Sequence, residues 1–413
     1  MIDLDSYISL NRRILTNVEV SAKYEKLYNM LIAHIKSDKI NVPKFKSVFS
    51  INRFTEILEC NSEHYLIYDQ YLGYTYFLLT EVYLLSKDNT DSLSYFYKIM
   101  AEFLQLRGEL KLSLLFALLH SKTIKPEWKD IETNLGIYLE KLMLVQDCFT
   151  IAHELMHLVF IKHDNKNEML DGEKQFLLDI WDGDEITFSK EDAQRELGNA
   201  FRASQTNPKN FSDYSEENLK RLEEKMLNKL NDTRLNEKKI LESTLNKVSF
   251  LEETQCDYWA AHCVFQAMKV ELGLDIYTIY NGVQLALQNL SSLKMLEQYS
   301  FSLINDDYNE LQIMVNESNF RILFLHLKMK KFFSQIDEKA PLIIDDEFSK
   351  VGIRYTQIIM DPLYYLIKNK VSDINKEYST VLSKYEQDYK EEEFLDSERN
   401  KMIDQLLGNK IKV

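Results

Sequence analysis

The decisive stretch of the sequence is Phe149-Thr150-Ile151-Ala152-His153-Glu154-Leu155-Met156-His157-Leu158-Val159-Phe160. It holds the pattern HExxH within an otherwise apolar segment, which predicts a buried helix. On a helix, His153 and His157 lie about 40° apart around the axis, so both imidazoles can reach one metal ion. Burying these polar side chains without such a role would be costly. The stretch therefore predicts a zinc site on a core helix.

Glu154 is predicted to be the catalytic base of this site. It lies about 100° around the helix from His153, so it stands beside the metal rather than binding it. Zinc lowers the pKa of a bound water toward about 7, and a neighbouring carboxylate can then take its proton. The pattern thus favours hydrolysis by a zinc-activated water.

A catalytic zinc needs a third protein ligand, and one candidate is His163. It follows His157 by six residues, which gives the spacing HExxHxxxxxH. That arrangement needs a sharp turn after the second histidine, where a glycine normally stands and this chain has Phe160. With Phe160 the helix is expected to continue and to carry His163 away from the metal.

The preferred third ligand is Glu253, in the segment Leu251-Glu252-Glu253-Thr254-Gln255-Cys256-Asp257-Tyr258-Trp259-Ala260. Glu253 and Asp257 are four residues apart and share a helix face. Asp257 is placed to accept the second ring N–H of a metal-bound histidine. Glu252 is the alternative ligand, but it would leave Asp257 on another face. Arg321 is expected to form a salt bridge, and the alternative is that it reaches the metal site.

Small residues share the face of Glu253 and Asp257, which predicts close packing against the HExxH helix. They are Ser249, Cys256 and Ala260, followed by Val264.

The composition favours a mainly α-helical protein with a small β-sheet, an α+β fold. The 413 residues are 45% hydrophobic and include only 10 Gly and 5 Pro, so long helices can form. One hairpin is predicted, with strands at 54–60 and 65–68 around a turn at Asn61-Ser62-Glu63. Helices are expected at 1–38, 76–85, 92–120, 215–245 and 248–270, and one or two more between about 128 and 161.

Three parts are expected along the chain. Residues 1–50 form an N-terminal helical segment, and residues 51–335 form the zinc-binding core, with an insertion at about 164–245. Residues 340–413 form a C-terminal helical segment after a break at Ala340-Pro341. A loop and a new helix start are expected at 123–128.

The charge of −15 argues against nucleic acid and anionic membranes as partners, since no basic stripe is present. The acidic N-terminus does not resemble a signal peptide, and no apolar run approaches the roughly 18 residues of a membrane span. The cysteines Cys60, Cys148, Cys256 and Cys263 stand singly, as in a reducing compartment. A cytoplasmic protein is expected.

HExxH followed about a hundred residues later by E-x-x-x-D resembles the gluzincin zinc metallopeptidases. This chain has Cys256 where many relatives have Ala. The segment His64–Asp69 followed by a helix resembles the edge strand of small gluzincins, which binds the substrate backbone by strand addition. The resemblance implies a zincin-like core with helical extensions.

Within that group, the chain is similar to the Lit-type phage-exclusion peptidases. This resemblance implies Zn²⁺ as cofactor, cleavage of an intracellular protein such as a translation factor, and a role in phage defence. One alternative is a catalytically silent zinc-binding regulatory or interaction module, against which the intact Glu154 argues. Another is a hydrolase of a non-peptide amide.

Overall fold

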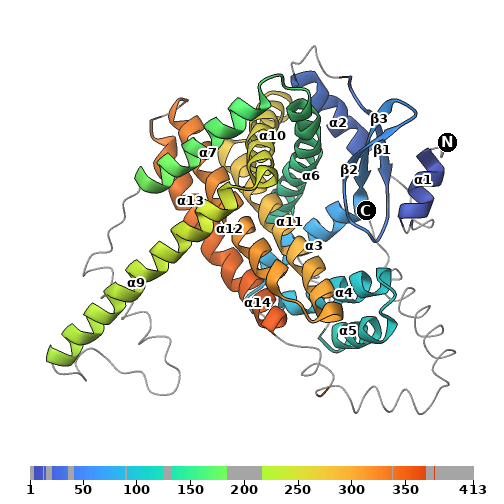
Figure 1. The fold of residues 1–413 in the computed structure, drawn as a ribbon. Coiled ribbons are helices and arrows are strands. Elements are labelled where there is room, and N and C mark those ends of the chain that lie inside the picture. The colour runs from blue at the N-terminus through green and yellow to red at the C-terminus, as the bar shows by residue number, and fades with distance from the viewer. Residues whose placement is uncertain are drawn as a thin grey trace. The chain divides into compact units, whose positions relative to one another are not determined.

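The computed structural model describes residues 4–12, 14, 21–35, 41–88, 91–123, 133–183, 216–336, 338–368 and 376. These residues form many helices and one three-stranded sheet, which confirms the predicted mainly α-helical fold with a small sheet (Figure 1). The predicted loop and helix start at 123–128 lie, after Thr123, outside the described residues.

The N-terminal half contains the sheet and the first six helices. These elements are α1 (Leu4–Asn11), α2 (Lys23–His34), β1 (Lys44–Val48), β2 (Glu56–Cys60), β3 (Glu63–Asp69), α3 (Gln70–Leu85), α4 (Asp91–Leu106), α5 (Leu110–Thr123) and α6 (Thr133–Ile161). The rest of the described chain is helical. Its elements are α7 (Lys166–Gly183), α9 (Glu216–Leu245), α10 (Val248–Leu272), α11 (Ile276–Asn305), α12 (Asn309–Ser334), α13 (Ala340–Tyr355), the π-helical turn η2 (Thr356–Met360) and α14 (Asp361–Lys368).

The predicted hairpin is present as β2 and β3, which pair antiparallel. Its two turn residues, Asn61 and Ser62, have φ angles of 54° and 63°, the left-handed conformation that two-residue hairpin turns require. Strand β1, which the sequence did not predict, pairs parallel with β3. The sheet order is therefore β1-β3-β2.

The resemblance of His64–Asp69 to an edge strand is not supported. This segment is strand β3, and β3 is the central strand, hydrogen-bonded on both sides. The expectation fails because β1, for which no strand was predicted, pairs with the second side of β3. The two edges of the sheet are β1 and β2, and β2 contacts helix α6.

Helix α6 carries the HExxH segment. It runs unbroken for 29 residues and contacts α2, α3 and α11 as well as the sheet. Its length and mean hydropathy alone would allow it to cross a membrane. The sequence did not predict this, because polar residues interrupt the apolar runs of this segment. In the fold, however, 72% of its most apolar stretch is buried, as is typical of a helix in a protein core.

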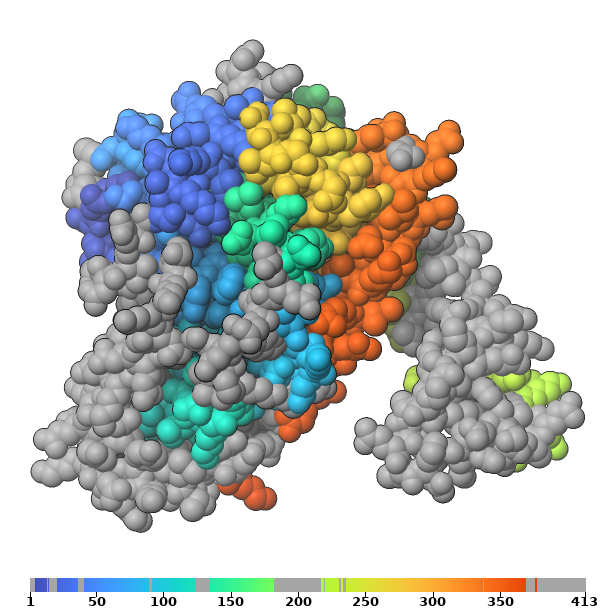
Figure 2. Space-filling model, turned by 180° about the vertical axis from the view of Figure 1, so that it is seen from behind, coloured from blue at the N-terminus to red at the C-terminus, as the bar shows by residue number. Residues whose placement is uncertain are grey.

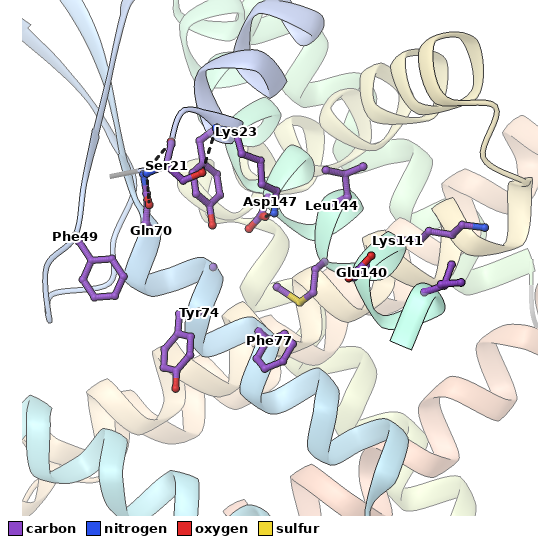
Figure 3. A pocket seen from close by; sticks show the side chains of 14 residues that line it. Ser21, Lys23, Phe49, Gln70, Tyr74, Phe77, Glu140, Lys141, Leu144 and Asp147 are labelled. Carbon is purple, nitrogen blue, oxygen red and sulfur yellow. Dashed lines mark hydrogen bonds and ion pairs between the residues drawn. The ribbon is translucent and has the colours of Figure 1, made fainter. Parts of the chain in front are cut away.

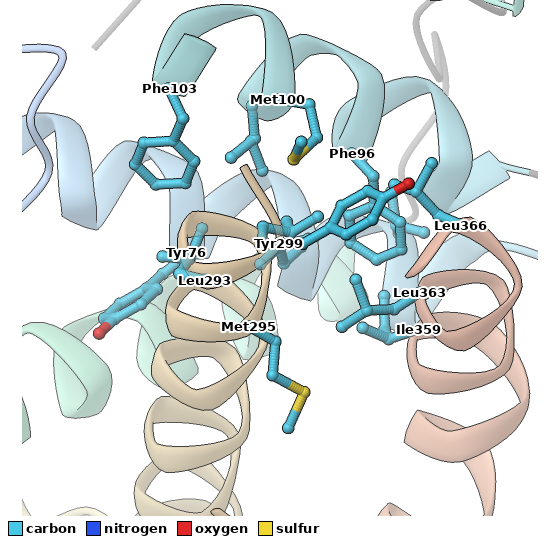
Figure 4. Packing of buried hydrophobic residues seen from close by; sticks show 14 of the residues in the cluster. Tyr76, Phe96, Met100, Phe103, Leu293, Met295, Tyr299, Ile359, Leu363 and Leu366 are labelled. Carbon is cyan, nitrogen blue, oxygen red and sulfur yellow. The ribbon is translucent and has the colours of Figure 1, made fainter. Parts of the chain in front are cut away.

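The main hydrophobic core lies among α3, α4, α5, α6, α11, α13, η2 and α14 (Figure 4). Its large buried side chains include Tyr76 from α3, Phe96 from α4, Tyr299 from α11 and Leu363 from α14. Residues far apart in the sequence thus share one core.

Figure 2 shows the surface of α2 next to the end of α10, where His34 Nε2 lies 3.3 Å from Glu271 Oε1.

The chain divides into two compact units. One comprises residues 1–164 and 254–413, and the other comprises residues 165–253. The first unit includes residues 1–50, which were expected to be a separate helical segment but contain strand β1, paired with β3 of the core. The second contains α7, the long charged helix α9 and the start of α10, and the boundary falls inside α10, between Glu253 and Thr254.

Candidate metal centre

Three predicted ligands come together. One side-chain donor atom from each of His153, His157 and Glu253 lies within 4.8 Å of the others, so the group could hold a metal ion. The two histidines lie one turn apart on α6, and Glu253 lies in the second turn of α10. His153 is buried, whereas His157 and Glu253 are half-buried, which leaves the group reachable from outside.

The spacing of the histidines suits zinc. Their Nε2 atoms lie 3.2 Å apart. Two nitrogens bound to one zinc at about 2.0–2.1 Å with a tetrahedral angle would be separated by about 3.3 Å. One carboxylate and two imidazoles form the donor set of several catalytic zinc sites, with a fourth position left for water. The residues present therefore fit a zinc ion.

The ring of His153 is oriented from its far side by Asp257. His153 Nδ1 lies 3.0 Å from Asp257 Oδ1, and Arg321 donates two hydrogen bonds of 2.8 Å to the same carboxylate. Burial alone raises the pKa of Asp257, but the charge of Arg321 and the hydrogen bond from His153 outweigh it and hold the pKa below its ordinary value. The carboxylate is thus ionised and can only accept a hydrogen bond.

This arrangement fixes the tautomer of His153. Because Asp257 accepts, Nδ1 carries the ring proton and Nε2 presents its lone pair toward the metal position. Asp257 is where the sequence placed it, and Arg321 forms the expected salt bridge.

His157 has a different partner on α10. Its Nδ1 lies 3.6 Å from the sulfur of Cys256, which is fully buried. A thiol can donate or accept a weak hydrogen bond, so Cys256 can serve either tautomer of His157. The sequence showed Cys256 only as a small residue on the packing face. The signal available was its position, one residue before Asp257.

Glu154 is half-buried on α6, next to His153. Its charge acts on Tyr76 of α3. Burial raises the pKa of Tyr76, and the charges of Asp147 and Glu154 raise it further, against a hydrogen bond with Thr150. Tyr76 is fully buried and was not singled out in the sequence. It brings α3 to the face of α6 that carries Glu154.

The other candidate ligands are not part of the group. Helix α6 continues past Phe160 and ends at Ile161, and the exposed His163 lies with its ring 6.4 Å from that of Trp259. Within the described ranges, the three-residue metal group includes Glu253 and neither His163 nor Glu252.

The remaining histidines have other surroundings. His262 packs against Phe332, and His326 lies between Tyr280 and Asp345.

Comparison of the chain with protein-family models, with curated proteins and with solved structures finds no match.

Proposed function

We propose that the protein is a zinc-dependent peptidase of gluzincin type that hydrolyses a peptide bond in an intracellular protein. The observation that carries the proposal is the pairing of two Nε2 atoms 3.2 Å apart with the nearby carboxylate of Glu253. Both rings are held from behind by neighbouring residues of α10. A purely structural zinc would normally have four protein ligands, whereas this group offers three.

The residues divide the work as follows. His153, His157 and Glu253 would hold the metal ion, which would supply Lewis acidity and lower the pKa of the attacking water. Glu154 takes a proton from the attacking water and delivers it to the leaving amine. Asp257, fixed by Arg321, keeps the ring of His153 in its binding orientation.

Glu154→Gln provides the direct test. The amide cannot accept the proton, but none of the three metal ligands is changed. We expect the variant to bind about one zinc per chain, measured by elemental analysis, and to lose peptidase activity. His153→Ala and His157→Ala should lose both zinc and activity.

The readout for activity is quantitative proteomics. Cells that express the wild type are compared with cells that express Glu154→Gln, and a protein fragmented only by the former is the substrate. Identical proteomes with zinc bound in both would favour the silent zinc-binding module. Full zinc retention by both histidine variants would remove the basis of the proposal.

The similarity to Lit-type peptidases leads us to propose a narrow target, such as a translation factor, a cytoplasmic location and a trigger connected with phage infection. An ungated peptidase there would damage its host. Docking is proposed at about 164–245 and after residue 340, of which 184–215 and most of 369–413 lie outside the described residues. Rapid, unselective casein cleavage by the purified enzyme without any added factor would contradict gating.

A further inference from the structure

A cavity of about 740 Å³ lies between α2, α3 and α6, with one wall from the end of β1 (Figure 3). It is separate from the metal centre, because none of the metal-binding group lines it. Asp147, which lines it, precedes His153 by six residues and so faces about 120° away around α6. The volume is in the range of sites that bind small molecules, about 300–1,000 Å³.

The walls of the cavity are largely apolar and aromatic. Tyr74 and Phe77 of α3 are stacked, with ring centroids 6.5 Å apart and planes inclined by 16°. The other apolar lining residues include Tyr24, Phe49, Met143 and Leu144. Parallel aromatic faces of this kind favour a flat, apolar ligand body.

The polar end of the cavity is built around the fully buried Asp147. Its Oδ1 accepts a hydrogen bond of 2.7 Å from Tyr68, and its Oδ2 accepts one of 2.9 Å from Lys23 Nζ. A Cβ at Gly73 would lie 2.7 Å from Asp147 Oδ1 and 2.8 Å from the Tyr68 hydroxyl. The glycine is what allows α3 to approach this pair.

The side chain of the neighbouring Gln70 is also hydrogen-bonded within the protein. Its side-chain oxygen accepts from the backbone N–H of Ser21 at 3.1 Å, and its amide nitrogen donates to Ser47 Oγ at 3.1 Å and to the Ser21 carbonyl at 3.3 Å. The acceptor oxygens of Asp147 and Gln70 are thus each already hydrogen-bonded within the protein.

Lys23 can donate further hydrogen bonds to a ligand. Its ammonium has three donors, and its side chain is 44% exposed at the cavity. Lys141, also in the lining, is exposed and has no ion pair within the described ranges. The lining holds two ammonium groups, Lys23 and Lys141, and two carboxylates, Glu140 and Asp147, so a ligand with one anionic group is balanced better than one with several.

We propose that this cavity binds a flat, largely apolar small molecule that carries one anionic group, with the aromatic body between α3 and α6 and the anion on Lys23. Volume, aromatic walls and the distribution of spare donors all point to that ligand class. The site does not depend on the metal or on the proposed peptidase activity.

Two fluorescent probes with closely related bodies test the proposal. Anilinonaphthalene sulfonate is aromatic and anionic, and N-phenyl-1-naphthylamine is its uncharged counterpart. In titrations of the full chain, we expect one site per chain and roughly tenfold tighter binding of the anionic probe, since a charge-assisted contact is added. Addition of a chelator should leave both isotherms unchanged.

Three variants locate the site. Lys23→Met should abolish the preference for the anionic probe, and Leu144→Trp should block both probes by filling the cavity. Leu342→Trp, at a surface position that is 74% exposed on α13, is the matched control and should bind like the wild type. Ile137→Trp at the rim replaces Leu144→Trp if that variant does not fold by circular dichroism.

Two results would overturn the proposal. Equal binding of both probes to the wild type would show that the cavity does not prefer an anionic ligand. Unchanged binding of the probes by the folded tryptophan variants would show that the probes bind elsewhere.

Discussion

Single residues on α10 orient the rings of His153 and His157, the two histidines of the candidate metal centre. Asp257 accepts from His153 Nδ1, and Cys256 contacts His157 Nδ1. When His157 Nδ1 accepts from the thiol, His157 Nε2 carries the ring proton and can donate it to His153 Nε2, 3.2 Å away. With a metal ion on Nε2, His157 Nδ1 would carry the ring proton and the same thiol would accept the hydrogen bond. Cys256 can thus support both states without moving.

We expect Cys256→Ala to weaken zinc binding by about tenfold, because His157 Nδ1 loses its partner on α10. Cys256→Ser, whose hydroxyl also donates and accepts, should restore part of the affinity. Competition with a chromogenic chelator measures both variants. Wild-type affinity in the alanine variant would mean that Cys256 only fills space.

Single substitutions also test the assignment of Glu253, rather than His163, as the third ligand. Glu253→Gln should weaken zinc binding by more than the roughly 10- to 100-fold effect of losing an outer hydrogen-bond partner, because an anionic ligand is removed. His163→Ala, at an exposed position outside the group, should bind zinc like the wild type. The reverse pattern in a zinc titration would show that His163 is the ligand.

At the level of elements, the close approach of α6 and α11 supports the helix that carries the metal site. Gly282 of α11 lies so near Val145 that an added Cβ would be 2.6 Å from the Val145 side chain. The valine is branched at Cβ, and that Cβ atom itself is one of the close contacts, so the side chain cannot rotate away. Glycine is required here for packing.

Gly282→Ala should therefore destabilise the protein by about 1–3 kcal/mol through overpacking. Gly352→Ala on α13 is the matched control, since a Cβ there meets nothing within 4 Å. It should stabilise by about 0.5–1 kcal/mol, the usual gain of alanine over glycine within a helix. Urea unfolding of the two variants checks both signs, and similar effects would show that the helices can separate locally.

For the whole molecule, the response to acid depends on histidines buried by tertiary packing. His326 of α12 is 4% exposed, stacks on Phe348 with ring centroids 3.9 Å apart, and lies 2.7 Å from the Tyr280 hydroxyl. Burial lowers the pKa of His326 to about 4, although the charge of Asp345 partly opposes the shift. The folded protein thus disfavours the charged imidazole.

The unfolded chain protonates His326 near pH 6.5, whereas the folded chain does so near pH 4. Between these values only the unfolded state binds the proton, so the free energy of unfolding falls as pH decreases, by about 3 kcal/mol in total. Glutamine does not titrate. Between pH 6.5 and 4, the free energy of unfolding of His326→Gln should therefore fall by about 3 kcal/mol less than that of the wild type. Parallel curves for wild type and variant in denaturant unfolding would contradict this origin.

The sequence alone determined the local features of this protein. HExxH spacing fixes two imidazoles on one helix face, because the α-helical repeat does so in any context. The apolar surroundings of that motif, few glycines and prolines, and the Asn61-Ser62 turn were enough for a mainly helical fold with one hairpin. The face shared by Glu253 and Asp257 follows from the same helical repeat.

Only tertiary structure decided what lies opposite those faces. Pairing of β1 with β3 joins segments whose sequence does not alternate strongly, so the central position of β3 could not be read from it. The contacts of Arg321 with Asp257 and of Cys256 with His157 span 64 and 99 residues. Such partners depend on how whole helices pack, since sequence periodicity specifies which face is buried but not which face it meets.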